Sequence, residues 1–343
     1  MSVLRFLLFP FALIYDWVTR LRNHLYDIGY KHAIEFDRMV ICVGNINVGG
    51  SGKTPMIEYL IRLFAPHFKV ATLSRGYGRK TRGFRIASNE DSAKTLGDEP
   101  FQFYLKFKDL ISVSVGEERA LAIPEMLLQK PEIDIILLDD AFQHRPVKPA
   151  YSILLTEYSK PFFDDFILPM GTLREARLGA KRADVIVVTK CPSDISSEEK
   201  GKIKLAIHKY AVNKPVFFSA IKYGHPIGIN DYKTSRPANK VIAVSGIAQS
   251  NIFETHLGSL FSIAHHFDFA DHHAYTEEDL MQIEQRAKLT GPDVSIMTTE
   301  KDMVKLLSFK ERMSLSWYYI PIETVFIENG AEFDRSMLQT MKS

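Results

Sequence analysis

Residues 43–54 read Val43-Gly44-Asn45-Ile46-Asn47-Val48-Gly49-Gly50-Ser51-Gly52-Lys53-Thr54, a glycine-rich run between two apolar segments. The apolar run Met39–Val43 before it predicts a buried strand, and apolar residues at helical spacing over Met56–Phe64 predict a helix. In a strand, turn and helix of this kind, backbone N–H groups and the positive end of the helix can surround a polyphosphate. The sequence therefore predicts a nucleotide-binding P-loop made of Asn47, Val48, Gly49, Gly50, Ser51, Gly52, Lys53 and Thr54.

Within this loop, Lys53 is expected to reach the β- and γ-phosphates and the Thr54 hydroxyl to ligate Mg²⁺. One position departs from the strict P-loop pattern, which has glycine where this chain has Asn47. Asparagine adopts the left-handed backbone conformation more readily than most residues, so the loop is still expected to form. The alternative is a glycine-rich turn before a helix that binds no ligand.

The overall composition is that of a globular protein. A length of 343 residues suggests about two domains. The formal net charge of +2 is too balanced to indicate nucleic acid as a partner. The two cysteines, Cys42 and Cys191, have neither metal-binding nor disulfide spacing, so a reduced cytoplasmic setting is expected.

Residues 1–30 are expected to form a separate amphipathic helix. The apolar run Phe6–Tyr15 is shorter than the ~20 residues needed to span a bilayer. It also lacks the small-residue end of a signal peptide. The helix could pack on the protein's own core, contact a membrane surface, or do both. Its predicted apolar stripe is Leu4, Leu7, Leu8, Phe11, Tyr15 and Val18, and its predicted interfacial anchors are Tyr15, Trp17, Arg20 and Arg22.

Short apolar strands alternate with helical patterns after this segment. Such alternation predicts an α/β fold, a P-loop NTPase-like parallel sheet with helices on both faces. Ligands of such sheets bind at the carboxyl ends of the strands. The predicted strands are Met39–Val43, Lys69–Leu73, Ile111–Val115, Ile133–Leu138, Ser152–Leu155 and Asp184–Thr189.

Acidic residues stand at two of the positions that this rule selects. The strand Ile133–Leu138 ends in Asp139 and Asp140, the Walker B arrangement in which a carboxylate holds Mg²⁺. Two acids at the end of a buried strand are costly unless they meet a cation. Asp98 and Glu99 lie between a glycine and a proline. They could be functional, or they could simply open a helix, where acids are favoured.

A loop rich in glycine and basic residues, Ser74–Gly83, follows the second predicted strand. It could bind phosphate groups of substrate or nucleotide, with Arg75 nearest the strand end. The alternative is a solvated basic loop.

Taken together, these segments resemble one family, the tetraacyldisaccharide 4'-kinases of lipid A biosynthesis. The resemblance spans nearly the whole chain, and its motifs follow one another in the family's order. Ala141 stands where many members have glycine, a departure that leaves the neighbouring acids untouched. The motifs are residues 43–45, 48–55, 74–78, 97–100, 139–145, 168–175, 269–273 and 298–302.

The resemblance implies a kinase that uses ATP and Mg²⁺. Such an enzyme moves the γ-phosphate of ATP to the 4'-hydroxyl of tetraacyldisaccharide 1-phosphate and so produces lipid IVA. Its lipid substrate implies peripheral contact with the cytoplasmic face of the bacterial inner membrane. We assign substrate binding to Arg75, Gln143, His144, Arg145 and Arg174, and metal binding to Thr54, Asp139, Asp140 and Glu99.

The resemblance also implies that His272 is the partner of Asp98. A carboxylate oriented by histidine is a suitable acceptor for the proton of the 4'-hydroxyl. Lys53, Asp98 and His272 are therefore the expected catalytic residues. Because His272 belongs to the second half of the chain, closure of two lobes is expected to assemble this pair.

The second half is predicted to be a smaller α/β domain. The composition of the polar segment Pro226–Lys240 predicts a linker, and apolar strands resume at Val241–Val244. The expected domains are residues 1–30, 31–223 and 224–343, the last contributing to an interlobe active site. The histidine-rich stretch His265–His273 matches no standard zinc pattern.

Two other functions compete with the kinase. A P-loop GTPase or metallochaperone-type switch is suggested by Val187–Pro192, which resembles a guanine-specificity motif but has Pro192 where that motif needs aspartate. A membrane-binding module that uses nucleotide only for structure is the other. The acids at 98, 99, 139 and 140 argue against it.

Overall fold

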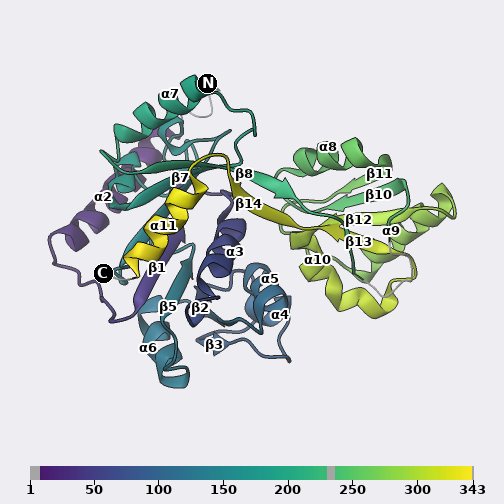
Figure 1. Ribbon diagram of the computed structural model, residues 1–343, viewed down its shortest axis with the longest axis horizontal. Coiled ribbons are helices and arrows are strands. Elements are labelled where there is room, and N and C mark those ends of the chain that lie inside the picture. The colour runs from purple at the N-terminus through teal and green to yellow at the C-terminus, as the bar shows by residue number, and fades with distance from the viewer. Residues whose placement is uncertain (1–7, 230–235, 342–343) are drawn as a thin grey trace. The chain divides into compact units, whose positions relative to one another are not determined.

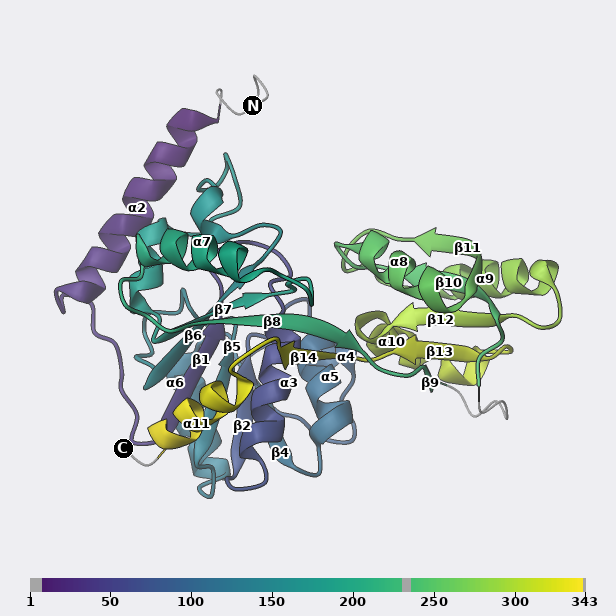
Figure 2. The ribbon, with the colours of Figure 1, turned by 45° about the horizontal axis from the view of Figure 1, so that its top comes forward.

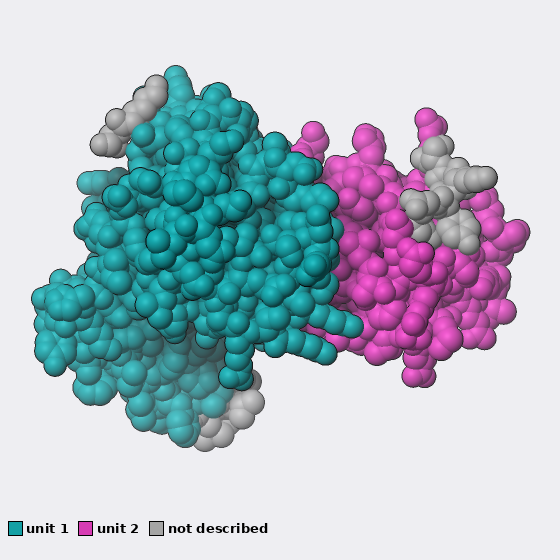
Figure 3. Space-filling view, turned by 90° about the horizontal axis from the view of Figure 1, so that it is seen from below, with its two compact units in different colours: residues 1–221, 324–343 teal, residues 222–323 magenta. Residues whose placement is uncertain are grey.

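The computed structural model describes residues 8–229 and 236–341. Contacts divide the chain into two units, coloured separately in Figure 3. The first unit comprises residues up to Ile221 and from Thr324 onward, and the second comprises Lys222–Glu323. The sequence predicted one domain over 224–343. In the structure, the end of the chain returns to the first unit because strand β14 (Ile322–Phe326) joins its sheet beside β8.

The first unit is built on a nine-stranded sheet in the order β14-β8-β7-β6-β1-β5-β2-β4-β3 (Figure 1). The pairs from β8 through to β4 are parallel, and the short β3 runs antiparallel to β4. The strand β14 runs antiparallel to β8, since Gly224 donates to the Pro321 oxygen and Ile327 to the Phe218 oxygen. The P-loop strand β1 therefore lies between β5 and β6. The strands are β1 (Met39–Gly44), β2 (Val70–Ser74), β3 (Arg85–Ile86), β4 (Ile111–Val115), β5 (Ile135–Asp139), β6 (Tyr151–Glu157), β7 (Val185–Thr189) and β8 (Val216–Tyr223).

Apolar cores cover both faces of this sheet. Alternate residues of β1 enter opposite cores, with Val40 and Cys42 on one side and Ile41 and Val43 on the other. This period of two explains why the strands read as continuous apolar runs. One face is covered by α3 (Lys53–Phe64), α5 (Asp98–Phe107) and α11 (Gly330–Thr340), and the other by α6 (Arg119–Gln129) and α7 (Ser197–His208). The predicted α/β class with helices on both faces is confirmed.

The C-terminal helix α11 completes the core on the α3 face. Phe333 and Met337 are fully buried there, and the rings of Phe333 and Phe217 meet edge to face at 5.3 Å. Tyr59 of α3 donates a hydrogen bond of 2.7 Å to Asp334, so α3 and α11 lie side by side, as Figure 1 also shows.

Helix α2 (Phe9–Asp27) runs along the outside of the first unit (Figure 2). Its outer face consists of Leu13, Ile14, Trp17, Val18 and Leu21, each at least 42% exposed. The predicted stripe through Phe11, Tyr15 and Val18 only partly matches this face, and Leu4 and Leu7 lie outside the described residues. No helix in the described part of the chain is both long and apolar enough to cross a bilayer.

The inner face of α2 contacts the core of the first unit. Tyr15 donates to the main-chain oxygen of Arg174 at 3.1 Å, and Arg22 donates to that of Gln143 at 3.2 Å. These two residues were predicted to be interfacial anchors, but their side chains are used for docking on the protein. Packing on the protein's own core is therefore one role of this helix.

The second unit has a five-stranded sheet in the order β11-β10-β12-β13-β9. It is parallel except for β9, which runs antiparallel to β13. Part of the predicted linker becomes the edge strand β9, and residues 230–235 of that linker lie outside the described chain. The strands are β9 (Ile227–Gly228), β10 (Lys240–Ser245), β11 (Ser262–Asp268), β12 (Ser295–Thr299) and β13 (Trp317–Ile320), and the helices are α8 (Ser250–Leu260), α9 (Glu277–Thr290) and α10 (Glu300–Leu306).

Candidate active site

The P-loop joins the end of β1 to the start of α3, as its sequence predicted. Gly49 and Gly52 have φ angles of 120° and 81°, which side chains other than glycine rarely adopt. Gly44 is needed for a different reason, since a Cβ there would lie 2.7 Å from the Cβ of Phe142. The short turn explains Gly49 and Gly52, and the close approach of residue 142 explains Gly44.

Asn47 does not need the left-handed conformation that the sequence analysis invoked for it, because its φ is not positive. The loop is shaped instead by a distant segment. Asn47 forms a bridge with Leu173 and donates from Nδ2 to Asp165 at 3.2 Å. The amide of Val48 donates to the Thr172 oxygen at 2.7 Å. The segment around residue 172 therefore forms one wall of the P-loop.

Asp140 lies between two positively charged side chains, Lys53 of the P-loop and Arg174. Its carboxylate accepts two bonds from the guanidinium of Arg174, at 2.7 and 3.1 Å, and lies 3.8 Å from Lys53 Nζ. Burial alone would raise the pKa of Asp140, but Lys53 and Arg174 outweigh it and hold the pKa below its usual range. Asp140 is therefore an anion that is already paired.

Asp139 has the opposite environment. It is 3% exposed, and within the described chain only one of its carboxylate oxygens has a partner, the Ser74 hydroxyl at 3.2 Å. Burial, and then the charges of Glu99 and Asp140, raise the pKa of Asp139 to about 7. A cation beside its unpartnered oxygen would relieve both the burial and the repulsion.

These residues fit Mg²⁺, although they do not enclose it. Among the residues that the structure describes, no three histidine, cysteine, aspartate or glutamate side chains gather closely enough to hold a metal. Mg²⁺ in phosphoryl-transfer sites is usually held by one or two carboxylates, phosphate oxygens and water. A single buried, unpartnered Asp139 oxygen at the end of β5 meets that requirement.

Asp98 and Glu99 form the first turn of α5, which is fixed to the P-loop helix. Gly97 before them has a φ of 95°, and a Cβ there would lie 2.9 Å from the Tyr77 oxygen. Farther along, the fully buried Glu58 of α3 accepts from Gln102 at 2.9 Å and from Lys106 at 2.6 Å. These bonds hold the two helices in one register, so the acids keep a fixed distance from the P-loop.

The basic loop after β2 is only partly available to a ligand. Arg75 is exposed at the strand end, as expected. Arg79 is almost completely buried and bonds Glu117 at 2.6 Å, so this member of the loop is structural. The solvated alternative is therefore wrong for Arg79, and phosphate binding by Arg75 stays a prediction.

Gln143, His144 and Arg145 lie between the strand ends and α2. Gln143 donates to the Asn45 oxygen at 2.9 Å, and Arg145 donates to Asp27 at 2.8 Å. Burial, and then Arg119, lower the pKa of His144 to about 4, so this imidazole is neutral at physiological pH. A hollow of about 250 Å³ opens here, lined by Arg22, Tyr26, Glu118, Gln143, His144, Arg145 and Pro146.

Two buried charges at this site were missed by the sequence analysis. Arg119 is 3% exposed and donates to the main-chain oxygen of Asp139 at 3.3 Å. Glu175 is completely buried and accepts from Arg182, Gln143 and Asn23 at 2.8 to 2.9 Å. The only sequence signal for Arg119 was its place just after β4, and Glu175 was quoted only within a longer motif.

His272 lies in the second unit, on a loop held by the residues of the 298–302 motif. Its φ is 62°, and Lys301 Nζ lies 3.3 Å from both its Nε2 and Asp271 Oδ1. The buried Asp302 accepts from the Gly246 amide at 2.9 Å and forms an ion pair with Lys305 at 2.8 Å. Because Asp98 and His272 belong to different units, their pairing stays a prediction.

Other histidines of the second unit have protein partners. His266 bonds the Ser245 hydroxyl at 2.8 Å, and His273 bonds Asp279 at 3.0 Å. These contacts favour a structural role for both histidines.

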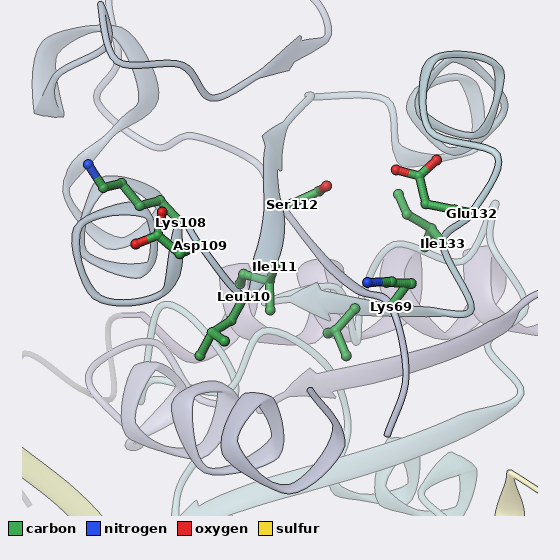
Figure 4. Close-up of a pocket in the computed structure, with 9 residues that line it drawn as sticks. Lys69, Lys108, Asp109, Leu110, Ile111, Ser112, Glu132 and Ile133 are labelled. Carbon is green, nitrogen blue, oxygen red and sulfur yellow. The ribbon is translucent and has the colours of Figure 1, made fainter. Parts of the chain in front are cut away.

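A second hollow lies at the opposite edge of the large sheet (Figure 4). It has a volume of about 160 Å³ and includes Lys69, Lys108 and Glu132, which come from the segments before β2, β4 and β5. Amino ends of parallel strands are not where ligands of such sheets bind. The candidate active site is therefore the P-loop edge.

Comparisons with known proteins find the same kind of protein over nearly the whole chain. The model of a family described as Tetraacyldisaccharide-1-P 4'-kinase matches residues 4–342. A protein of Flavobacterium johnsoniae named Tetraacyldisaccharide 4'-kinase is 44% identical in an alignment of 345 positions that covers 100% of this chain and 98% of that protein. One of the same name from Cytophaga hutchinsonii is 39% identical, covering 94% of this chain and 92% of its own length. The crystal structure of an "apo" form of LpxK from Aquifex aeolicus in complex with ATP has a TM-score of 0.77 at 26% identity, covering 99% of this chain and 100% of that one.

Proposed function

We propose roles in phosphoryl transfer for the residues of this chain, because the chain belongs to the tetraacyldisaccharide-1-P 4'-kinase family. The enzyme moves the γ-phosphate of ATP to the 4'-hydroxyl of tetraacyldisaccharide 1-phosphate in lipid A biosynthesis, using ATP and Mg²⁺. The names of the relatives do not favour a GTPase switch. The observation that carries the assignment of roles is that Lys53, Asp139 and Asp140 converge beside the P-loop.

The P-loop amides and Lys53 bind the β- and γ-phosphates. Thr54 and Asp139 hold Mg²⁺, which when bound neutralises charge on the phosphate oxygens. The unpartnered oxygen of Asp139 supports this choice, because the other acid, Asp140, is already paired with Arg174. Glu99, whose charge contributes to the raised pKa of Asp139, assists at the metal.

Asp98 accepts the proton of the attacking 4'-hydroxyl, and His272 orients its carboxylate. The support for Asp98 is its place at the start of α5, which Glu58 fixes to the P-loop helix. Most of the rate enhancement then comes from positioning and charge stabilisation, because the transition state of phosphoryl transfer is loose.

Arg75 and Arg174 bind the anionic head of the lipid. The 250 Å³ hollow beside Gln143, His144 and Arg145 is the place for the sugar, since it lies next to the strand ends and is bordered by α2. A neutral His144 in this hollow can hydrogen-bond sugar hydroxyls without repelling the neighbouring arginines.

The outer face of α2 lies on the cytoplasmic surface of the bacterial inner membrane, as a peripheral contact. A helix that contacts its own protein through one face leaves five large apolar side chains exposed on the other. Such an arrangement is typical of interfacial helices. The substrate's four acyl chains keep it in the bilayer, so the active site must work at that surface.

Trp17 provides a direct test of this contact. It is 65% exposed, whereas the other tryptophan, Trp317, is fully buried, so a blue shift of emission on adding vesicles reports Trp17. We expect Trp17→Ser to lose the shift and to weaken partition into anionic phospholipid vesicles by roughly tenfold, because burying a large apolar side chain contributes about 1.5–3 kcal/mol.

The matched control is Leu128→Ser, which removes an exposed leucine from α6. It should leave vesicle binding unchanged. Equal binding by Trp17→Ser and wild type in a sedimentation assay would exclude the outer face as the membrane contact.

The reaction itself is tested by following labelled γ-phosphate from ATP into purified tetraacyldisaccharide 1-phosphate in detergent micelles. We expect a labelled lipid that has gained one phosphate and that is absent with a Lys53→Ala variant. If ATP binds but no lipid is labelled, the acceptor has been assigned wrongly. A preference for GTP over ATP would instead support the switch protein.

A further inference from the structure

We propose that Tyr15 and Asn23, on the inner face of α2, are positioning residues that couple the seating of this helix to the catalytic centre. The inference rests on the proposed function, in which Arg174 belongs to the active site and α2 lies at the membrane surface. It concerns kcat, the turnover at saturating lipid.

The two residues bind consecutive positions of one active-site segment. The Tyr15 hydroxyl donates to the main-chain oxygen of Arg174 at 3.1 Å. Asn23 Nδ2 donates to the side chain of Glu175 at 2.9 Å. Tyr15 and Asn23 are eight residues apart in a helix of 3.6 residues per turn, so they share one face, opposite Trp17. The helix therefore holds residues 174–175 from two points.

Arg174 in turn contacts the catalytic centre. The Arg174 guanidinium bonds Asp140 at 2.7 Å and the Asn45 oxygen at 2.9 Å, and its amide donates to the Ile46 oxygen at 2.7 Å. Lys53 Nζ in turn lies 3.4 Å from the Asn45 side-chain oxygen. One residue thus separates α2 from the partners of the P-loop lysine.

The bond from Asn23 to Glu175 can affect the positions of the active-site side chains as well as the stability of the fold. Its carboxylate is completely buried and is bonded by Arg182, Gln143 and Asn23. Burial alone would raise the pKa of Glu175, but these donors hold it below its usual range. A buried anion that loses one donor is left with an unsatisfied oxygen, which is costly. We therefore expect Glu175 to shift towards its remaining donors and to displace Gln143, which donates to it, and its chain neighbour Arg174.

The two faces of α2 therefore have separable effects. The outer face decides how strongly the enzyme holds the lipid surface, which enters KM for the lipid. The inner face decides whether Arg174 keeps its bonds to Asp140 and Asn45 beside the P-loop, and this positioning enters kcat. Arg145 and Lys181 also bond Asp27 at the end of the helix, so α2 stays docked when the two inner contacts are removed.

The experiment compares steady-state transfer to tetraacyldisaccharide 1-phosphate in detergent micelles for variants of the full chain. The double variant Tyr15→Phe/Asn23→Leu should lower kcat about tenfold while KM for ATP stays within about twofold, because small misplacements of binding groups cost rate. The control is Thr19→Val, which removes a hydroxyl whose one bond within the described residues is to the main-chain oxygen of Asp16 in the same helix, at 3.0 Å. It should behave like wild type.

The decisive comparison repeats the double variant in an enzyme that already carries Arg174→Ala. If Tyr15 and Asn23 act through the Arg174 side chain, adding the double variant to Arg174→Ala should cause no further loss of kcat. A further tenfold loss there would mean a general effect on stability and would overturn the coupling. The milder single variant Tyr15→Phe, with thermal melting as a check of folding, keeps the test valid if the double variant folds poorly.

The other outcomes separate this inference from the proposed function. Wild-type kcat for the inner-face variant, with Arg174→Ala impaired, overturns the coupling alone. Wild-type kcat for Arg174→Ala overturns both the role of Arg174 and the coupling. The kinase assignment stands in either case if label still reaches the lipid.

Discussion

Replacing Lys53 with alanine is expected to lower kcat for phosphoryl transfer by about 10³-fold, the order found when a preorganised charge at a transition state is removed. The lysine side chain is only 12% exposed, and its ammonium lies between Asn45 and Asp140. It is therefore held in place before ATP arrives. Initial rates with labelled ATP and saturating lipid would measure the loss.

The fold should survive this change. Arg174 still pairs with Asp140 through two bonds, so the acid does not become an isolated buried charge. Lys108→Ala is the matched control, because it removes an exposed lysine from the hollow at the opposite edge of the sheet. A Lys53→Ala enzyme that keeps more than about a third of wild-type kcat would contradict the role, since such a loss is far below that of a transition-state charge.

Replacing Asp139 with asparagine is expected to have an effect of similar size, about 10³-fold in kcat, together with a higher Mg²⁺ requirement. Metal binding needs the ionised carboxylate. Because the pKa of Asp139 is raised to about 7, the wild-type rate at low Mg²⁺ should rise with pH through that value. Saturating Mg²⁺ should move this rise to lower pH. Asparagine does not titrate, so the rise should disappear in the variant.

The melting temperature shows whether a loss of activity in Asp139→Asn comes from misfolding. The folded-state pKa lies above the ordinary value of 3.8, so ionisation of this acid opposes folding as pH increases between 3.8 and about 7. Above pH 7 the full penalty is present in the wild type, and asparagine removes it. In the absence of Mg²⁺, the variant should therefore melt no lower than wild type at pH 8. A lower melting temperature would mean that the activity loss reflects misfolding.

Asp98→Asn is the contrast that separates metal ligand from base. It should lower kcat by about 10²-fold or more, within the usual range for general acid–base catalysis, without changing the Mg²⁺ requirement. His272→Ala should lose less than either acid if, as proposed, it acts through Asp98. An Asp98→Asn enzyme with wild-type activity would remove the base assignment.

Local pattern was enough to predict the parts of the site that are contiguous in the chain. The run from Met39 to Phe64 contains its own strand, turn and helix, and Asp139 ends its strand visibly. Each of these features depends on neighbours within a few residues. For the same reason, the central strands and the α/β class followed from the alternation of apolar runs.

Residues that depend on distant partners could not be predicted in this way. The wall of the P-loop comes from residues 172–174, more than a hundred positions away, and nothing local in that segment signals the contact. The inward direction of Tyr15 likewise depends on the position of Arg174. A helical pattern shows which residues share a face, but it does not show which face meets the protein.

The return of β14 and α11 to the first unit also bears on how the chain is made. On the ribosome, the second unit emerges as one uninterrupted segment, Lys222–Glu323, and it can fold as soon as it is complete. The first unit begins earlier but finishes later, because the partners of Phe217 and Tyr59 on α11 are synthesised only after the whole second unit. Until then, that apolar face of the nascent chain remains uncovered and is a site where chaperones would be expected to act.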